Sequence, residues 1–448
     1  MRKLIRALSA MWILYNIFFT VVYFLYLPKL IVRMVKRGGY GKKFLERLGI
    51  YSQDVLLKLR RNRRVWIHAV SLGEMFVALR FIEEFRAQGF PWSFVVTTTT
   101  TAGRSCAEKR LREDDVLIYL PVDFPFVVKR VFRLIQPVAL LLTESEWWPN
   151  LIRVAISSNT PVITINGRIS EKSLKRYRFL KPIFRRLFGG VTMFLLQSQT
   201  DAQRLIHLGA EPSKIHITGN AKYDCARQLS EEIDTSLLLK TCGFSSTEPI
   251  IVGGSTWHGE EEILVKIYKR LKAQFPGLRL ILAPRHVERT GEITEMLSRY
   301  EVTYIRRSNI DVEQRPDNMV EVLVVDTTGE LIKFYACAWV IFVGRSLTVH
   351  GGQNVIEPAA LGKPVITGPY TENFSDIVSE MIEDEAIIVI HDETELEDKI
   401  KQLLTDSELR KKYGRQARNS INKRGGSVQK SVKLISNILK VESFPVQR

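Results

Sequence analysis

The stretch VWIHAVSLGE, residues 65–74, decides the fold class predicted for this chain. Its first six residues form an apolar run with β-branched members, which is typical of a buried strand. After a short turn, Glu74 begins the segment EMFVALRFIEEF, whose apolar residues recur at helical spacing. The sequence therefore predicts a carboxylate at the carboxyl end of a parallel strand, the edge where open α/β sheets bind ligands. An acid in the first turn also stabilises the helix dipole, and Glu74 taken alone favours that structural role.

Strand-like and helix-like segments alternate on both sides of a stretch with little apolar content, residues 224–248. After Glu74, strands are predicted at residues 93–98, 116–120, 138–143, 161–165 and 193–198. Beyond residue 248, strands are predicted at residues 249–254, 278–284, 321–326, 339–344 and 363–367. This alternation, over 448 residues, predicts two doubly wound parallel α/β domains with a ligand-binding cleft between them. We expect a first domain at residues 31–223, a linker at 224–248, and a second domain at 249–448 that includes C-terminal helices.

The N-terminal residues 1–30 are predicted to form a membrane-anchor helix. Residues 7–28 carry no charge and, at about 1.5 Å per residue, would cover roughly 30 Å of hydrocarbon. The heavier basic flank follows this run, so the positive-inside rule predicts that the body of the protein lies in the cytoplasm. Ser9, Asn16 and Thr20 interrupt the apolar run, which leaves a monotopic helix in the membrane interface as an alternative.

The formal net charge of +17 and the isoelectric point near 9.6 indicate an anionic partner: nucleic acid, an acidic membrane surface or a phosphorylated substrate. Residues 168–186 hold eight basic residues against one acid, Glu171, which suits either an ordinary exposed surface or a surface that faces acidic lipid. The chain lacks the aromatic and basic platform of single-strand nucleic-acid binders. Its four cysteines have neither metal-ligand nor redox spacing, which fits a reducing compartment without structural zinc.

In the second domain, four strand-to-helix turns are rich in glycine or polar residues. Such turns offer backbone amides and the positive end of a helix dipole to an anion. Asn354 and Glu357, three residues apart, are predicted to share one face of a helix. The Glu357 carboxylate suits the hydroxyls of a ribose, although a helix cap would use the same residues. Together the four turns fit a nucleotide site. The candidate ligand-binding residues are Gly254, Ser255, Pro284, Arg285, His286, Gly329, Glu330, Leu331, Asn354, Val355, Ile356 and Glu357.

The first domain has further polar residues where its strands end. Glu144 and Glu146 lie in TESEWWPN, directly after a strand, and are expected at the same sheet edge as Glu74. Arg168, in NGRIS, follows the next strand and is a candidate ligand for an anion. Lys222, in GNAKYD, lies near the crossover between the domains, where a lone lysine is usually solvated.

The motifs VSLGE, TESEWWP, NGRIS, ITGNAKYD, APRH and GGQNVIEP, in this order and spacing, resemble the family of 3-deoxy-D-manno-octulosonic acid (Kdo) transferases. The likeness extends from the N-terminal anchor to about Pro369. It implies a GT-B architecture, with two Rossmann-like domains facing a cleft, and inverting transfer of Kdo from CMP-Kdo to the lipid A precursor (lipid IVA) in lipopolysaccharide biosynthesis. It also implies attachment to the inner membrane, with the catalytic domains on the cytoplasmic side of an anionic membrane surface.

By the same resemblance, Glu74 is the general base, while Glu144 and Lys222 stabilise the transition state. Arg285 and His286, residues 329–331 and residues 354–357 lie where the family binds CMP. Family members commonly read ETELWP and NARLS where this chain has TESEWWP and NGRIS, and neither departure removes one of these functional groups.

We expect no cofactor and no metal requirement, because the sequence has no Asp-X-Asp clamp and a CMP-sugar carries a single phosphate. One alternative is another membrane-associated GT-B glycosyltransferase of the envelope that uses a different nucleotide sugar. A non-catalytic binder of nucleotides or nucleic acid is a more distant alternative, and we expect no nucleic-acid partner.

Overall fold

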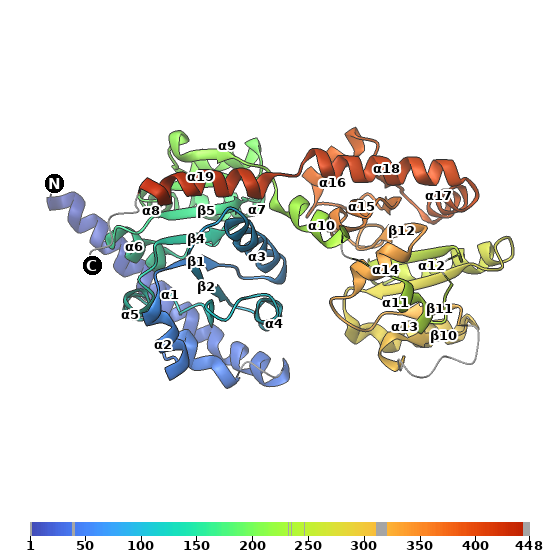
Figure 1. Ribbon diagram of the computed structural model, residues 1–448, viewed down its shortest axis with the longest axis horizontal. Coiled ribbons are helices and arrows are strands. Elements are labelled where there is room, and N and C mark those ends of the chain that lie inside the picture. The colour runs from blue at the N-terminus through green and yellow to red at the C-terminus, as the bar shows by residue number, and fades with distance from the viewer. Residues whose placement is uncertain are drawn as a thin grey trace. The chain divides into compact units, whose positions relative to one another are not determined.

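A computed structural model of the chain describes residues 2–37, 41–231, 233, 235–245, 247–310 and 320–441. The chain divides into two compact units, and each contains one seven-stranded sheet. The first unit comprises Met1–Asp224 together with Gly426–Arg448, and the second comprises Cys225–Gly425. Figure 1 shows helices packed around the sheet of each unit. The expected pair of α/β domains is therefore present.

The first unit is built on a parallel sheet with the strand order β3-β2-β1-β4-β5-β6-β7. Strand β1 (Arg64–His68) lies near its middle, and all five of its residues are buried, as expected for a parallel strand covered on both faces. Its neighbours pair with it in parallel, so that Ile67 lies opposite both Val96 and Leu141. The other strands are β2 (Ser93–Thr98), β3 (Val116–Tyr119), β4 (Ala139–Thr143), β5 (Val162–Gly167), β6 (Met193–Leu196) and β7 (Ile215–Ile217).

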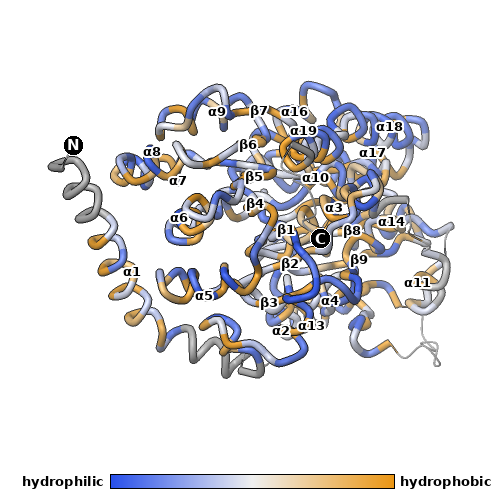
Figure 2. Tube along the Cα trace, turned by 60° about the vertical axis from the view of Figure 1, so that its left-hand side comes forward, coloured by the Kyte–Doolittle hydropathy of each residue, from blue (hydrophilic) through white to orange (hydrophobic). Residues whose placement is uncertain are grey.

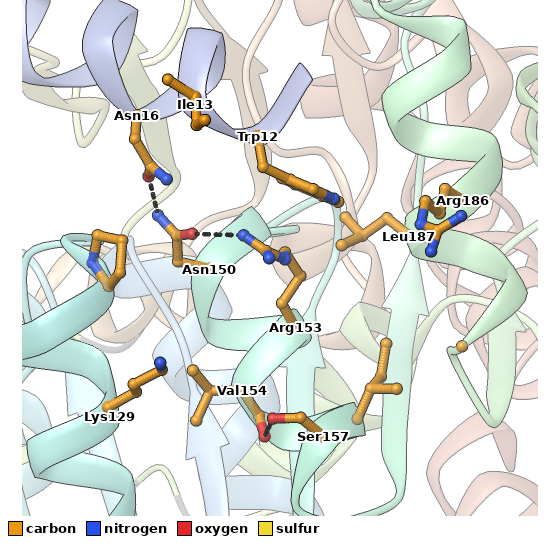
Figure 3. Close-up of a pocket in the computed structure, with 13 residues that line it drawn as sticks. Trp12, Ile13, Asn16, Lys129, Asn150, Arg153, Val154, Ser157, Arg186 and Leu187 are labelled. Atoms are coloured by element: carbon orange, nitrogen blue, oxygen red, sulfur yellow. Dashed lines mark hydrogen bonds between the residues drawn. The ribbon is translucent and has the colours of Figure 1, made fainter. Parts of the chain in front are cut away.

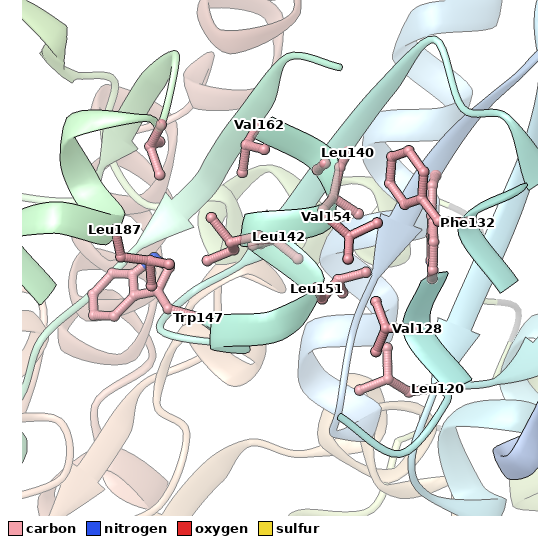
Figure 4. Packing of buried hydrophobic residues seen from close by; sticks show 14 of the residues in the cluster. Leu120, Val128, Phe132, Leu140, Leu142, Trp147, Leu151, Val154, Val162 and Leu187 are labelled. Atoms are coloured by element: carbon pink, nitrogen blue, oxygen red, sulfur yellow. The ribbon is translucent and has the colours of Figure 1, made fainter. Parts of the chain in front are cut away.

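Helices cover the first sheet and bury its apolar residues. Leu140 and Leu142 of β4 belong to one core cluster with Phe132 of α5 and Leu151 of α6 (Figure 4). Truncating such a buried leucine to alanine typically costs about 2–5 kcal/mol. The helices are α2 (Gln53–Arg61), α3 (Leu72–Ala87), α4 (Thr101–Glu108), α5 (Pro125–Ile135), α6 (Pro149–Ser157), α7 (Glu171–Arg178), α8 (Lys181–Gly189) and α9 (Gln199–Leu208).

The second unit repeats the plan with the strand order β10-β11-β9-β8-β12-β13-β14, again in parallel. Its strands are β8 (Ile250–Thr256), β9 (Arg279–Pro284), β10 (Tyr304–Arg306), β11 (Val322–Val324), β12 (Val340–Val343), β13 (Val365–Thr367) and β14 (Ile388–Val389). Its helices include α12 (Glu260–Lys272), α13 (Thr290–Arg299), α14 (Leu331–Cys337), α15 (Ile356–Ala360), α16 (Ser375–Glu383), α17 (Glu393–Thr405) and α18 (Ser407–Lys423). The sequence did not predict β7, β10 or β14, which are outer strands of two or three residues.

Helix α1 (Arg2–Arg37) packs along the first unit by one face. The Tyr15 hydroxyl donates a hydrogen bond to the buried Asp123 carboxylate at 2.9 Å, and the Asn150 amide donates to the Asn16 side chain at 2.7 Å. Phe19 adds an edge-to-face ring contact with Phe124. The opposite face is apolar and exposed, with Leu14, Phe18 and Leu25 among its side chains.

This helix contains residues 1–30 that the sequence predicts as a membrane anchor, apart from Met1, and it extends beyond residue 30 to Arg37. Its segment Trp12–Lys29 has a mean hydropathy of 1.3 and is long and apolar enough to cross a membrane by length and composition. Figure 2 shows hydrophobic residues along most of its described length. Because one face is packed against the first unit, the apolar surface that remains for a membrane is confined to the other face.

The C-terminal helix α19 (Ser427–Val441) returns to the first unit, where it packs against α3 (Figure 1). Asp224 fixes the start of this helix by accepting hydrogen bonds from the backbone amides of Gly426 at 2.6 Å and Val428 at 3.0 Å. This corrects the expectation that the last helices all belong to the second domain. The linker expected at residues 224–248 is also different, because α10 (Ala221–Glu231) and α11 (Ser236–Thr241) occupy much of it.

We expect Asp224→Ala to loosen the return of α19. The substitution removes a charged acceptor from two backbone amides, and each such bond contributes about 1.5–3 kcal/mol. Hydrogen exchange at the amides of residues 426–428 should therefore become faster. Asp406, which caps α18 through the amides of Glu408 and Leu409, provides the matched control. Asp406→Ala should leave exchange at residues 426–428 unchanged, and equal acceleration by both variants would contradict the assignment.

Candidate active site

Glu74 lies at the junction between β1 and α3, as predicted, and it is nearly buried. Ser71 caps α3, and Glu74 closes a capping box with it. The Glu74 carboxylate accepts four hydrogen bonds: from the Val70 amide at 3.0 Å, the Ser71 amide at 3.3 Å, the Ser71 hydroxyl at 2.8 Å and the Thr143 hydroxyl at 2.8 Å. The structural role expected for a first-turn acid is therefore real. The hydrogen bond from Thr143 is not part of the helix cap, because Thr143 lies at the end of the neighbouring strand β4.

Glu144 and Lys222 form an ion pair at this edge of the sheet. Glu144 directly follows β4, and its positive φ of 49° turns the backbone sharply at the strand end. Its carboxylate lies 2.9 Å from the Lys222 ammonium, and both side chains are partly exposed. Lys222 comes from the first turn of α10, after β7, where the Asn220 side chain accepts a hydrogen bond from its amide. Lys222, which the family resemblance marks as a catalytic residue, is therefore held beside Glu144 and does not extend alone into solvent.

Glu146 completes a set of three carboxylates at this edge. Burial raises its pKa to about 7, and the nearby charges of Glu74 and Glu144 add to that shift. One hydrogen bond, from the Trp148 indole at 3.1 Å, opposes the shift. We refer to Glu74, Glu144, Glu146 and Lys222 together as the acidic edge.

His68, which the sequence did not single out, lies next to the acidic edge with its Nε2 atom 3.9 Å from Glu146. The ring is fully buried, and burial lowers its pKa to about 3. It is therefore neutral at physiological pH and forms no ion pair with Glu146. Its Nδ1 atom bonds to Thr97, and within the described part of the chain its Nε2 atom has no hydrogen-bond partner. In the sequence, the feature that could have identified His68 as a candidate site residue is its position at the end of the strand β1.

Arg168 follows β5, so that it lies at the same edge of the first sheet as the strand ends of β1 and β4. Burial raises the pKa of Asp201, and the charges of Arg168 and Arg204 oppose that rise. Arg168 thus lies in the electrostatic reach of a buried acid while its own side chain stays half-exposed.

The candidate residues of the second unit lie in the last residues of four adjacent strands, β11, β9, β8 and β12, or in the segments that follow them, and therefore belong to one sheet edge. At the end of β8, Gly254 lies against Tyr335, and a side chain added there would collide with the tyrosine ring. Ser255 has a positive φ of 53°. Glycine at position 254 is therefore required by the packing of Tyr335, while the backbone bends sharply at Ser255.

The turn after β9 presents two exposed side chains. Arg285 directly follows Pro284, the last residue of β9. Its backbone amide donates a hydrogen bond to the Thr256 carbonyl at 3.0 Å, which links this turn to the end of β8. The Arg285 and His286 side chains are exposed, and the His286 ring packs edge-to-face on Trp257 with centroids 4.8 Å apart. Arg285 also lies close enough to Glu357 for its charge to oppose the rise in the Glu357 pKa that burial causes.

The turn before α14 contains Gly329, with φ of 90°, followed by Glu330 and Leu331. The Glu330 carboxylate accepts from Arg307 at 3.1 Å and from the Thr327 hydroxyl at 2.7 Å. These contacts fix the turn from within the protein, so the Glu330 side chain has a structural role. A ligand would meet the backbone of this turn.

Asn354 and Glu357 come together, although in a different way from that predicted. Helix α15 begins at Ile356, so Asn354 precedes the helix and does not share a helical face with Glu357. The Asn354 side-chain oxygen accepts from the Ile356 amide at 3.1 Å, while its amide group donates to the Glu357 carboxylate at 2.9 Å. This is the helix-start interaction that the sequence allowed as the alternative. Val355 and Ile356 are buried, which leaves their backbone as the part available to a ligand.

Glu260 organises the loop that leads to this turn, and sequence reasoning missed it. It is buried at the start of α12 and accepts from the amides of Arg345 at 2.7 Å, Ser346 at 2.9 Å and Leu347 at 3.0 Å. In the sequence, Glu260 is the first of three consecutive glutamates, and nothing in that run distinguishes it from its neighbours. Within the residues that the structure describes, no group of three or more His, Cys, Asp or Glu side chains is arranged to hold a metal ion.

Known protein families match segments in both halves of the chain. A family model described as 3-deoxy-D-manno-octulosonic-acid transferase (kdotransferase) matches residues 42–225, and a model of glycosyl transferases group 1 matches residues 307–420. The 3-deoxy-D-manno-octulosonic acid transferase of Haemophilus influenzae is 32% identical over 409 residues, covering 90% of this chain and 93% of that protein. The enzyme of the same name from Bordetella pertussis is 32% identical over 384 residues, covering 84% and 87%.

Solved structures show the same architecture at low sequence identity. The UDP-GlcNAc 2-epimerase from Neisseria meningitidis bound to UDP-GlcNAc superposes with a TM-score of 0.58 at 14% identity, covering 85% of this chain and 100% of that one. This likeness concerns the fold alone. Together with the two seven-stranded parallel sheets, it confirms the predicted GT-B class.

The raised pKa of Glu146 predicts a pH-dependent effect of Glu146→Gln on stability. A folded-state pKa above the usual value means that the folded protein binds this proton more tightly than the unfolded chain. Ionisation of Glu146 therefore destabilises the wild type as pH rises from about 4.5 through about 7. The glutamine variant escapes this loss, so its melting temperature relative to wild type should rise by a few degrees between pH 5 and pH 8. Glu113→Gln, at an exposed position, is the control, and a pH-independent difference for Glu146→Gln would contradict the assignment.

Proposed function

Because the chain belongs to the family of 3-deoxy-D-manno-octulosonic acid transferases, we propose that it transfers Kdo from CMP-Kdo to the lipid A precursor in lipopolysaccharide biosynthesis. The chain is a glycosyltransferase with GT-B architecture. The observation that carries the proposal is 32% identity over nine-tenths of the length of a relative bearing that name. The acidic edge supplies the groups that such a transfer needs.

Glu74 is the general base of the proposed mechanism. Inverting transfer requires a group that removes the proton from the acceptor hydroxyl on the face opposite the leaving group. Two of the four donors to the Glu74 carboxylate are the hydroxyls of Ser71 and Thr143. A hydroxyl can rotate away, so an incoming sugar hydroxyl can take its place and donate to the same oxygen atom. The two backbone donors keep the carboxylate in position meanwhile.

Glu144 and Lys222 act as the transition-state stabilisers. Departure of CMP leaves negative charge on the phosphate, and a fixed ammonium group compensates such charge at low cost in reorganisation. The 2.9 Å contact with Glu144 holds Lys222 in one direction before substrate arrives. Arg168, at the same sheet edge, offers a second positive charge to an anionic substrate group.

The four turns of the second unit bind the donor nucleotide. The backbone bend at Ser255, next to Gly254, and the exposed side chains of Arg285 and His286 suit the single phosphate of CMP. The Glu357 carboxylate, oriented by Asn354, suits the ribose hydroxyls. The backbones of Gly329, Glu330 and Leu331 and of Val355 and Ile356 complete this site. The proposed reaction uses no cofactor and no metal, because charged side chains and helix starts perform the neutralisation.

Helix α1 and the basic surface of the first unit attach the enzyme to the cytoplasmic side of the inner membrane. The exposed apolar face of α1 supplies the hydrophobic contribution, and the basic residues 168–186 supply attraction to anionic lipid. This placement brings the active site to a lipid acceptor. In this proposal the basic charge of the chain attracts an anionic membrane, and the protein has no nucleic-acid partner.

The activity itself is tested by incubating the purified full-length chain with CMP-Kdo and the lipid A precursor in excess EDTA. We expect the mass of the lipid product to increase by one or more Kdo residues. Transfer from a UDP-sugar, and none from CMP-Kdo, would refute the donor. Activity that returns only when a divalent ion is added would refute the metal-free mechanism.

Glu74→Gln tests the base. Glutamine has nearly the same shape but does not accept a proton at neutral pH, so kcat should fall by roughly 10²–10⁴-fold, the usual contribution of a positioned base. The affinity for CMP should stay unchanged, since the proposed nucleotide residues are in the second unit. Ser198→Ala, which removes the cap of α9, is a control for lost capping, because it should lower the melting temperature and preserve kcat. A Glu74→Gln variant that is merely less stable would assign Glu74 to the helix cap alone.

Glu357→Gln tests the nucleotide site. The Asn354 amide can still donate to the glutamine oxygen, so the turn should keep its structure. Loss of one charged hydrogen bond to CMP should cost about 1.5–3 kcal/mol, or about 10–150-fold in Kd measured by calorimetry. Glu262→Gln, at the exposed start of α12, should leave the Kd unchanged. Equal affinities in wild type and Glu357→Gln would exclude a nucleotide role for this carboxylate.

A further inference from the structure

A cavity of about 830 Å³ lies between α1 and the helices α5, α6 and α8 of the first unit. Figure 3 shows Trp12, Ile13 and Asn16 of α1 on one side of it, with Asn150 and Arg153 of α6 facing them. Its volume falls within the range of small-molecule sites. The acidic edge and the proposed nucleotide site do not include the residues that line it, so the proposed reaction leaves the cavity without a role.

The cavity combines apolar walls with positive charge. Trp12, Ile13, Val154 and Leu187 contribute hydrophobic surface. Lys129, Arg153 and Arg186 also line it, and the described lining residues include no acid. Among the described residues, no carboxylate lies within ion-pair distance of these three cations.

The two arginines are close enough to affect one another. Burial lowers the pKa of Arg153, the charge of Arg186 lowers it further, and the charge of the buried Asp123 opposes the shift. The Arg153 guanidinium lies 4.1 Å from the centre of the Trp12 ring, and its contact with the Asn150 side chain is a long one, at 3.5 Å. An anion between Arg153 and Arg186 would relieve this repulsion and supply the acceptors that a guanidinium fork favours.

The surface around the cavity is apolar and exposed. Ile13, which lines the cavity, and Leu14 beside it are more than half exposed. Phe126, next to Pro125 at the start of α5, is 73% exposed. Exposed aromatic and aliphatic side chains around a basic, apolar-walled cavity match a lipid with a charged head group better than a free anion, which would need no apolar walls.

We propose that this cavity binds one anionic phospholipid of the bilayer, with the phosphate between Arg153 and Arg186 and an acyl chain against Trp12, Val154 and Leu187. Lys129 provides a further positive charge at the rim. The bound lipid fills the space between α1 and α6, so that it fastens α1 to the first unit in addition to the direct bonds from Tyr15 and Asn16. Binding requires neither donor nor acceptor substrate, so its measurement is independent of the proposed transferase activity.

The test is native mass spectrometry of the full-length, delipidated chain in detergent. The chain is titrated separately with dioleoyl phosphatidylglycerol, dioleoyl phosphatidylcholine, inorganic phosphate and the lipid A precursor. We expect one phosphatidylglycerol per chain, held about tenfold or more tightly than phosphatidylcholine, because only the former has a net negative charge. Equal binding of the two phospholipids, or displacement of phosphatidylglycerol by inorganic phosphate, would overturn the proposal. Preferential capture of the lipid A precursor by the same arginines would instead assign the cavity to the acceptor and overturn it as well.

Variants separate the charge from the cavity. The double variant Arg153→Gln and Arg186→Gln should weaken phosphatidylglycerol binding by about tenfold or more, through loss of charged hydrogen bonds. Ser157→Trp should block binding by filling the cavity without changing its charge. Arg415→Gln removes the same charge from an exposed position on α18, away from the basic residues 168–186, and should have no effect. Near-equal affinities across all four proteins would overturn the proposal, and circular dichroism establishes that each variant is folded.

Discussion

The Glu74 carboxylate accepts hydrogen bonds from the turn after β1 and from the last residue of β4, and the acidic edge of the first unit depends on this junction. The amides of Val70 and Ser71 fix how the chain leaves β1 and enters α3. The hydroxyl of Thr143 ties the end of the neighbouring strand to the same carboxylate. Because Glu144 and Glu146 directly follow that strand, one side chain sets the positions from which the other two acids project. A structural role and a chemical role therefore belong to the same group.

The three carboxylates of the acidic edge are chemically different because their surroundings differ. Glu74 has four donors, Glu144 has a lysine partner, and Glu146 has a single donor. Burial and the two neighbouring acids consequently raise the pKa of Glu146 to about 7. The buried ring of His68 is neutral and adds no compensating positive charge beside Glu146. Separation of neighbouring carboxylates by environment is how one site provides groups in different protonation states at one pH.

The sequence was sufficient to predict the parallel strands of both cores, because buried strands in α/β proteins are continuous apolar runs between turns. The short outer strands β7, β10 and β14 carry too few residues to show a pattern. Strand ends also predicted that Glu74, Glu144 and Glu146 share an edge. The bond from Thr143 to Glu74 joins residues 69 positions apart, and the contact of Asn16 with Asn150 spans 134. Such pairings follow from tertiary packing, and neither periodicity nor local propensity contains them.

The return of α19 to the first unit has a consequence for how the chain is made. Asp224 accepts hydrogen bonds from the amides of Gly426 and Val428. The two segments of the first unit are therefore separated in the sequence by about 200 residues, which form the second unit. A ribosome synthesises the chain from its N-terminus, and domains generally fold as units during synthesis. The second unit, continuous from Cys225 to Gly425, can therefore finish folding while the first still lacks the helix that packs on α3. For that interval the α3 surface that α19 covers in the finished protein stays uncovered.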